Sequence, residues 1–206
     1  KKKIITDLDI FYMQKIPVKS IVITGTNGKS TACKLIQHIL KTNKLDAQLG
    51  GNIGKPVLDL RIRKKSVVII EASSFQLAHT KFIKPTFAAI LNISIDHLDW
   101  HNTIANYKAS KFKIFSKQDS RDIALLADKK LIKLFKKKNY YGKLKIVNKD
   151  FLKNTTKKKI TNDYLVSEPN IENLGFAYHI SKIFKVKENF FIKAVNNFKG
   201  LPHRHE

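Results

Sequence analysis

The sequence predicts an α/β fold in which a mostly parallel sheet is flanked by helices. Short apolar runs rich in β-branched residues alternate with longer segments of helical periodicity, a pattern typical of βαβ units. A glycine-rich segment joins the first apolar run to the first helical segment. With 206 residues, of which 43% are hydrophobic, the chain is long enough to bury one sizeable core.

Each element is predicted from its own pattern. We expect buried strands where short apolar runs stand between turn-forming residues, at 20–24, 47–50, 66–71, 87–92, 122–127, 143–147 and 164–166. In the first helix Cys33, Ile36 and Leu40 recur at helical spacing. The predicted helices are 31–42, 103–115, 129–137, 170–184 and 188–198. Residues 148–162 are polar and rich in lysine, so we expect an irregular insertion there.

The charge is strongly basic, with 40 lysines and arginines against 16 acidic residues and a net charge of +24. Only Arg61, Arg63, Arg121 and Arg204 are arginines, whereas proteins that read nucleic acids rely on arginine for bidentate contacts. The lysines are scattered along the chain, which is typical of a solvated surface. We therefore expect no nucleic-acid partner, no membrane partner and a monomer. A nucleotide-binding or nucleic-acid-binding module without catalysis remains the alternative.

The cysteine content and the apolar runs indicate a compartment. Cys33 is the single cysteine and cannot form an internal disulfide, which favours a reducing environment. The apolar runs are far shorter than a membrane span, and the first ten residues lack the apolar core of a signal peptide. We expect a cytoplasmic location.

A phosphate-binding loop is predicted at residues 25–31, which are Gly25, Thr26, Asn27, Gly28, Lys29, Ser30 and Thr31. The segment follows the apolar run 21–23 and opens an amphipathic helix, as a phosphate loop requires. Its backbone N–H groups would surround phosphate oxygens, Lys29 would reach the β- and γ-phosphates, and Ser30 would hold Mg²⁺. Ile23 stands where the usual motif has its first glycine, and a glycine-rich turn that caps a helix is the alternative.

A metal-binding carboxylate is predicted at Glu71. It ends the strand 66–71, and a parallel sheet presents its ligand groups at the carboxyl ends of its strands. A carboxylate there can bind Mg²⁺ together with Ser30. A solvated surface glutamate is the alternative, but it explains poorly a glutamate that ends a run of four apolar residues.

The glycine-rich loop, T-G-T-N-G-K-S-T, and six further segments in order resemble the Mur ligase superfamily, which includes the folylpolyglutamate synthases. The six are G-G-N-I-G at 50–54, E-A-S-S-F-Q-L at 71–77, residues 92–99 with D-H-L-D, Y-K-A-S-K at 107–111, residues 170–173, and G-L-P-H-R at 200–204. S-S-F-Q-L and G-L-P-H-R resemble the branch that joins D-glutamate to UDP-N-acetylmuramoyl-L-alanine. Another Mur ligase or a folylpolyglutamate synthase remains open.

The resemblance implies an ATP-dependent amide ligase that works through an acyl phosphate with ATP and Mg²⁺. It implies that His97 is a second metal ligand and that Lys111 is carbamylated and bridges toward the metal. Without the resemblance, a polar loop histidine and a solvated helix lysine would be the ordinary interpretations.

The resemblance also implies binding residues. Asn52, Ser73 and Gln76 would bind the nucleotide-sugar substrate, although turn and helix-cap chemistry would explain them equally well. Asn173 would face adenine or ribose and Arg204 the nucleotide. Pro169 replaces the histidine that usually precedes the family's counterpart of Asn170, which puts the local geometry in doubt.

The same resemblance divides the chain into three parts. Residues 1–12 would end an N-terminal domain that binds the UDP-linked substrate, 13–199 would form the ATP-binding central domain, and 200–206 would begin an amino-acid-binding domain. Since the rest of both flanking domains is absent from the sequence, we expect the chain alone to be inactive as a ligase.

Overall fold

The computed structural model describes residues 4–148 and 159–201. Its described part contains a six-stranded sheet in the order β2-β3-β1-β4-β5-β6, and every neighbouring pair is parallel. The strands are β1 (Lys19–Thr24), β2 (Ala47–Gly51), β3 (Val67–Glu71), β4 (Phe87–Ile90), β5 (Ile123–Leu126) and β6 (Lys143–Ile146). The predicted α/β fold with a parallel sheet is confirmed.

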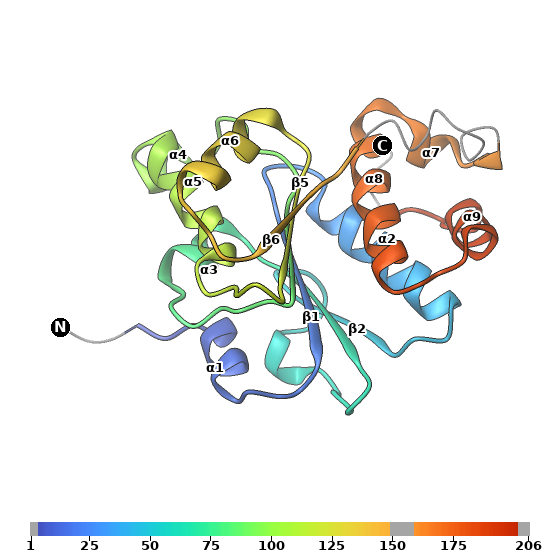
Figure 1. Ribbon diagram of the computed structural model, residues 1–206, viewed down its shortest axis with the longest axis horizontal. Coiled ribbons are helices and arrows are strands. Elements are labelled where there is room, and N and C mark those ends of the chain that lie inside the picture. The colour runs from blue at the N-terminus through green and yellow to red at the C-terminus, as the bar shows by residue number, and fades with distance from the viewer. Residues whose placement is uncertain (1–3, 149–158, 202–206) are drawn as a thin grey trace.

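Helices cover both faces of the sheet, as Figure 1 shows. On one face lie α2 (Lys29–Thr42), α8 (Glu168–Ile183) and α9 (Glu188–Asn196), and on the other α3 (Ser74–His79), α5 (Ile104–Phe112) and α6 (Lys129–Lys137). Side chains alternate along β1, so Ile21 and Ile23 join the core under α2 while Val22 joins the core on the opposite face. Strands buried on both faces explain the continuous apolar runs in the sequence.

Five shorter helical elements complete the described fold. They are α1 (Asp7–Met13), the 3-10 turns η1 (Val57–Asp59) and η2 (Lys113–Phe115), α4 (Leu98–His101) and α7 (Asp163–Val166). The sequence patterns did not predict α1, α3, α4 or η1. The predicted helix 103–115 divides into α5 and η2. Most of the predicted insertion at 148–162 lies outside the described residues, because 149–158 are not described.

The predicted strand at 164–166 is wrong, because these residues lie in the helix α7. The side chain of Asn162 accepts a hydrogen bond from the Leu165 backbone N–H at 3.3 Å and so caps the helix. The Asn162 amide also donates to the carbonyl oxygens of Val195 and Phe198, at 2.9 and 2.8 Å. These contacts bind the segment beside α9 and leave it no place at a sheet edge.

The strand order reverses beside β1, which positions a ligand crevice. The chain leaves β1 through α2 on one face of the sheet, whereas it leaves β3 through α3 on the other face before entering β4. The loops after β1, β3 and β4 therefore diverge at the carboxyl ends of the strands. Open α/β sheets bind ligands at such a reversal.

A buried carboxylate ties α1 to the segment that follows α3. Asp9 is fully buried, and its Oδ1 accepts hydrogen bonds from the Thr80 hydroxyl at 2.5 Å and from the backbone N–H groups of Lys81 and Phe82 at 2.8 Å. Burial raises the pKa of Asp9, but these hydrogen bonds outweigh burial and leave the pKa below its ordinary value.

Replacing Asp9 with asparagine should remove an acid-dependent part of the folding stability. Because the pKa of Asp9 is lowered by folding, the stabilisation is complete above the unfolded pKa of about 4 and is lost as pH falls through the folded pKa. At pH 7 the variant should lose about 1–3 kcal/mol in urea denaturation, and the loss should shrink below pH 4. Asp7→Asn, in the same helix turn, is the control with little loss. An equal loss at every pH would contradict this account.

Candidate active site

The loop between β1 and α2 has the backbone geometry of an anion site. Gly28 begins α2 with φ +80°, in the left-handed region, and a Cβ there would lie 2.4 Å from Oδ1 of Asn173 in α8. Only glycine permits both this conformation and this close approach. The first N–H groups of α2 have no partner within the helix and point toward the loop's mouth, where the helix dipole favours negative charge.

Asn92, just beyond β4, holds the loop from one side. Its side-chain Oδ1 accepts from the Asn27 backbone N–H at 2.9 Å, and its amide donates to the Asn27 carbonyl oxygen at 3.3 Å. Its own carbonyl oxygen accepts from the Thr26 backbone N–H at 3.0 Å. No site role was predicted for Asn92, although a polar residue directly after a buried strand is a signal that could have identified it.

The predicted phosphate-binding side chains lie at this loop. Lys29 Nζ donates to the carbonyl oxygens of Gly25 and Thr26 at 3.1 and 2.7 Å, so its ammonium group lies over the loop. Ser30 is nearly buried, and the Thr31 hydroxyl hydrogen-bonds the Tyr164 hydroxyl at 3.3 Å.

A pocket of about 380 Å³ joins the loop to Glu71 at the end of β3. Glu71 is 2% exposed, and its Oε1 accepts from the Asn52 amide at 3.1 Å. Its Oε2 is buried and has no hydrogen-bond partner among the described residues. A buried carboxylate oxygen without a partner is costly unless a cation satisfies it, and Ser30 supplies a second oxygen to the same pocket. These hard oxygen donors fit Mg²⁺.

A second pocket of about 130 Å³ adjoins the first, because Lys29 and Asn52 line both. Here lie His97 and Lys111, so the structure brings the four predicted metal-site residues into adjoining pockets. His97 has φ +50° at the start of α4, and its Nε2 lies 3.4 Å from Oδ2 of Asp96. Among the described residues no group of three or more His, Cys, Asp or Glu side chains is arranged to hold a metal.

Ser73 also lines the second pocket, and its polar groups form a capping box with those of Gln76. The Ser73 hydroxyl accepts from the Gln76 backbone N–H at 3.2 Å, and Gln76 Oε1 accepts from the Ser73 backbone N–H at 3.1 Å. Asn52 likewise uses its amide on Glu71. The contacts of Ser73 and Gln76 are thus those of a helix cap. The substrate-binding roles of Asn52, Ser73 and Gln76 stay predictions.

Lys111 is buried rather than solvated, which excludes the surface alternative. It is 1% exposed, and its Nζ donates to the Gly25 carbonyl oxygen at 2.8 Å and to the Thr24 hydroxyl at 3.4 Å. Burial and the nearby Lys29 ammonium lower the pKa of Lys111 to about 7, against the opposing effect of Asp96. Near neutral pH a large fraction of Lys111 is therefore the neutral amine.

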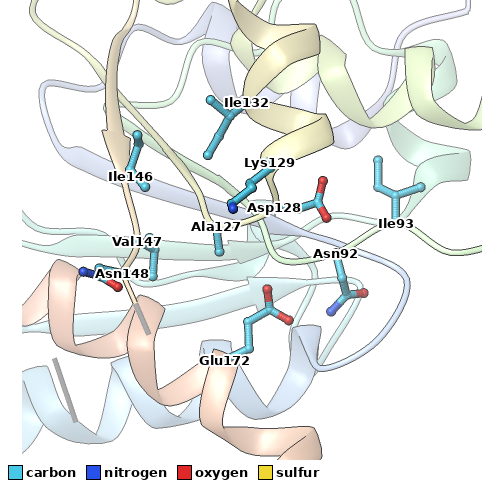
Figure 2. Close-up of a pocket in the computed structure, with 10 residues that line it drawn as sticks. All are labelled: Asn92, Ile93, Ala127, Asp128, Lys129, Ile132, Ile146, Val147, Asn148 and Glu172. Atoms are coloured by element: carbon cyan, nitrogen blue, oxygen red, sulfur yellow. The ribbon is translucent and has the colours of Figure 1, made fainter. Parts of the chain in front are cut away.

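A larger cavity of about 960 Å³ lies on the other side of Asn92 (Figure 2). Residues at the carboxyl ends of β4, β5 and β6 and in α6 line it together with Glu172 of α8, and Figure 2 shows the side chains of Asn92, Asp128 and Glu172 lying around it. This cavity was not predicted from the sequence. Asn173, the next residue of α8, is 2% exposed and donates to Oδ1 of Asn170 at 3.2 Å. Arg204 lies outside the described residues.

The fold and this site agree with a family match. The Mur ligase middle domain matches residues 23–192. The chain belongs to the Mur ligase family. A UDP-N-acetylmuramoylalanine–D-glutamate ligase of Rickettsia felis is 35% identical over 98% of this chain and 49% of the relative, and one of Aquifex aeolicus is 34% identical over 100% and 51%. The chain thus spans about half the length of the curated relatives it matches.

Solved Mur ligases share the fold. MurF from Acinetobacter baumannii gives a TM-score of 0.71 at 16% identity and covers 96% of this chain and 49% of that chain. MurF from Thermotoga maritima, solved in complex with ADP, gives 0.70 at 14% identity, with 94% and 51% covered. The resemblance stated from the sequence motifs is therefore confirmed at the level of family and fold. In the described ranges of this Mur ligase chain, no helix is long and apolar enough to cross a membrane.

Replacing Lys111 with methionine should stabilise the chain, and the gain should depend on pH. The folded pKa of about 7 lies below the unfolded value of about 10.4, so burial of the ammonium group costs most below pH 7. Between about pH 7 and 10 the unfolded chain binds the extra proton, and the stability of the natural chain rises with pH. The methionine variant should gain roughly 2 kcal/mol at pH 6 and progressively less toward pH 10 in urea denaturation.

Lys108→Met is the matched control, because Lys108 lies on the same helix and is only partly buried. Its stability difference from the natural chain should change little with pH. A constant difference for Lys111→Met across pH 6–10 would contradict the burial of an ammonium group at this position.

Proposed function

We propose that this chain is the ATP-binding part of a ligase that joins D-glutamate to UDP-N-acetylmuramoyl-L-alanine, a step of peptidoglycan synthesis. The observation that carries the proposal is the convergence of the phosphate loop, the partnerless Glu71 oxygen and the buried Lys111 on two adjoining pockets. The relatives from Rickettsia felis and Aquifex aeolicus, which carry the name of this ligase, favour it over the other Mur enzymes and the folylpolyglutamate synthases.

The arrangement of the two pockets and the larger cavity supports one orientation of bound ATP. The reacting γ-phosphate must face the carboxylate that it activates, so it belongs beside Glu71, His97 and Lys111. The nucleoside then leaves the loop on the opposite side, past Asn173, where the cavity of about 960 Å³ opens next to Asn92. That cavity adjoins the loop and has the size and mixed lining of a small-ligand site.

The chemistry needs two balanced steps. An oxygen of the L-alanine carboxylate attacks the γ-phosphorus, the bond to the β-phosphate oxygen breaks, and ADP leaves. The amine of D-glutamate then attacks the acyl carbon, the carbon–oxygen bond to phosphate breaks, and phosphate leaves while the nitrogen loses its proton. Lys29 would exchange the carbonyl oxygens of Gly25 and Thr26 for phosphate oxygens and offset the charge that builds up there.

Glu71 and Ser30 would hold Mg²⁺, which when bound offsets the charge of the phosphates and the reacting carboxylate. His97, with Asp96 against its Nε2, would hold the second metal position. The neutral amine of Lys111 would attack CO₂, forming a nitrogen–carbon bond and releasing a proton, and the resulting carbamate would place an anionic oxygen pair on the rim of the same pockets.

The chain's share of its relatives' length supports the domain division that the motif resemblance implies. We assign ATP and metal binding to residues 13–199, substrate contacts to Asn52, Ser73 and Gln76 in part, and binding of the UDP and D-glutamate moieties to flanking domains. Cys33, the single cysteine, is buried in α2 and fits a reducing compartment such as the cytoplasm.

The function is tested by joining the chain to the N- and C-terminal parts of the Rickettsia felis relative. The fusion should release phosphate from ATP only when both UDP-N-acetylmuramoyl-L-alanine and D-glutamate are present, and mass spectrometry should find the amide product. The chain alone should bind Mg·ATP weakly and form no amide. Lys29→Ala in the fusion should lower turnover at least ~100-fold with an unchanged circular dichroism spectrum.

Lys34→Ala, on the same helix, is the control and should keep full turnover. Turnover that survives Lys29→Ala would show that the site is misplaced. Duplex DNA binding that falls steeply with salt, with no preference for Mg·ATP, would instead favour a non-catalytic nucleic-acid-binding module.

Lys111→Ala in the fusion should lose activity that high concentrations of acetate or formate partly restore, because a short carboxylate can take the place of the carbamate. Phosphate release with and without added carboxylate measures the rescue. A lysine that serves only as a hydrogen-bond donor would show none. Lys108→Ala should stay active and unaffected by acetate.

A further inference from the structure

Tyr107 joins the phosphate loop to the helix that carries Lys111. It is 1% exposed, and its hydroxyl hydrogen-bonds the Thr26 hydroxyl at 3.1 Å. Tyr107 precedes Lys111 by four residues on α5, so both side chains lie on the same face of the helix. The Nζ of Lys111 lies 4.5 Å from the centre of the Tyr107 ring. One side chain thus contacts both the loop and the lysine.

Thr26 connects the loop to two other segments through its side-chain hydroxyl. Its hydroxyl accepts a hydrogen bond from the Ser94 backbone N–H at 3.0 Å in addition to the contact with Tyr107. Its carbonyl oxygen accepts from Lys29 Nζ at 2.7 Å. The Thr26 hydroxyl thus joins the segment after β4 to α5. A shift of Thr26 would also move Lys29, which is bonded to the Thr26 carbonyl oxygen.

We propose that Tyr107 is a positioning residue, whose hydroxyl fixes, through Thr26, the distance between the phosphate loop and Lys111. The inference rests on the proposed ligase function for its kinetic consequence, but the link itself is a property of the folded chain. Its ring has a separate role, because it packs beside His101 and Lys111 whether or not the hydroxyl is present.

The Tyr107 hydroxyl is needed to hold the loop against α5 because Lys29 and Lys111 lie close together there. Lys29 and Lys111 both donate to the carbonyl oxygen of Gly25, at 3.1 and 2.8 Å, so two amines share one acceptor, and they repel each other whenever Lys111 carries its proton. A phenylalanine at 107 would fill the same core space but would leave the loop free to move away from α5 under this repulsion. Reactions between bound groups are sensitive to displacements of about 1 Å.

Tyr107→Phe tests the link, and Tyr12→Phe is a closely matched control. Tyr12 is partly buried, and its hydroxyl donates to the Ser20 hydroxyl at 3.0 Å, away from the loop. Each variant loses one tyrosine–hydroxyl hydrogen bond, so the two should lose similar stability in urea denaturation. In the fusion, Tyr107→Phe should lower kcat about 10-fold or more and change KM for ATP by less than about threefold. Tyr12→Phe should keep kcat.

A second measurement does not depend on activity. In the chain itself, ¹³C-labelled lysine side chains observed by NMR report the titration midpoint of Lys111, assigned by its absence in Lys111→Met. In Tyr107→Phe the loop and α5 should separate, Lys111 should gain water, and its midpoint should rise toward the ordinary lysine value. Thr26→Val should give the same rise, Thr26→Ser should not, and the Tyr107→Phe/Thr26→Val double variant should add nothing to either single change.

A Tyr107→Phe chain with the kcat and the Lys111 midpoint of Tyr12→Phe would overturn the proposal and reduce Tyr107 to core packing. If the unsubstituted fusion makes no amide, the ligase function fails, whereas an unmoved Lys111 midpoint in Tyr107→Phe and Thr26→Val would separately overturn the link. Should Tyr107→Phe fail to fold, Thr26→Val with Thr26→Ser as its control decides the question by the same two measurements.

Discussion

The site depends on a loop that cannot take its hydrogen bonds from the sheet. Residues 25–28 leave the carboxyl end of β1 and must reach the start of α2, so their backbone groups find partners on side chains from other elements. Asn92 supplies two side-chain bonds and one backbone bond. Because these partners stand at the ends of buried strands and on packed helices, the loop is held rigidly although it has no secondary structure of its own.

Burial determines which charges at this edge act chemically. The chain carries 40 lysines and arginines, yet only Lys29 and Lys111 are placed at the loop in the described structure. Lys111 cannot relax into water, and Lys29 lowers its pKa further. Glu71 is a buried group of the opposite charge. One of its carboxylate oxygens accepts a hydrogen bond from Asn52, and the other has no partner among the described residues. The net charge of the chain therefore does not indicate the chemistry of the site. That chemistry depends on the two amines and the one carboxylate that are buried or held there.

The sequence predicted what local patterns encode. Apolar runs located six strands, and the glycine-rich segment located the loop, because strand burial and the turn into α2 are written in neighbouring residues. The run at 164–166 misled, because the capping side chain of Asn162 and its bonds to α9 outweigh three apolar residues. The capping box of Ser73 and Gln76 could have been predicted as a helix start, since its two residues are only three positions apart.

The rest of the site depends on contacts between distant segments, which spacing does not reveal. Nothing in the pattern of α5 distinguishes Lys111, which is buried, from Lys108, which is partly exposed, and only the motif resemblance singled it out. Asn92 and Tyr107 hold the loop from β4 and α5, and their partners are set by the sheet order. Sequence reasoning found the residue types that bind phosphate and metal but missed the residues that hold them in place.

The contact between Gly28 and Asn173 has a consequence for how the protein is made. Gly28 and Asn173 are separated by 145 positions in the sequence, so one wall of the phosphate site is built only after α8 has been synthesised and has docked on α2. A nascent chain with β1, α2 and the glycine loop already formed would still lack that wall. Contacts of such high sequence separation form slowly, which means that nucleotide binding can report the docking of α8 on α2.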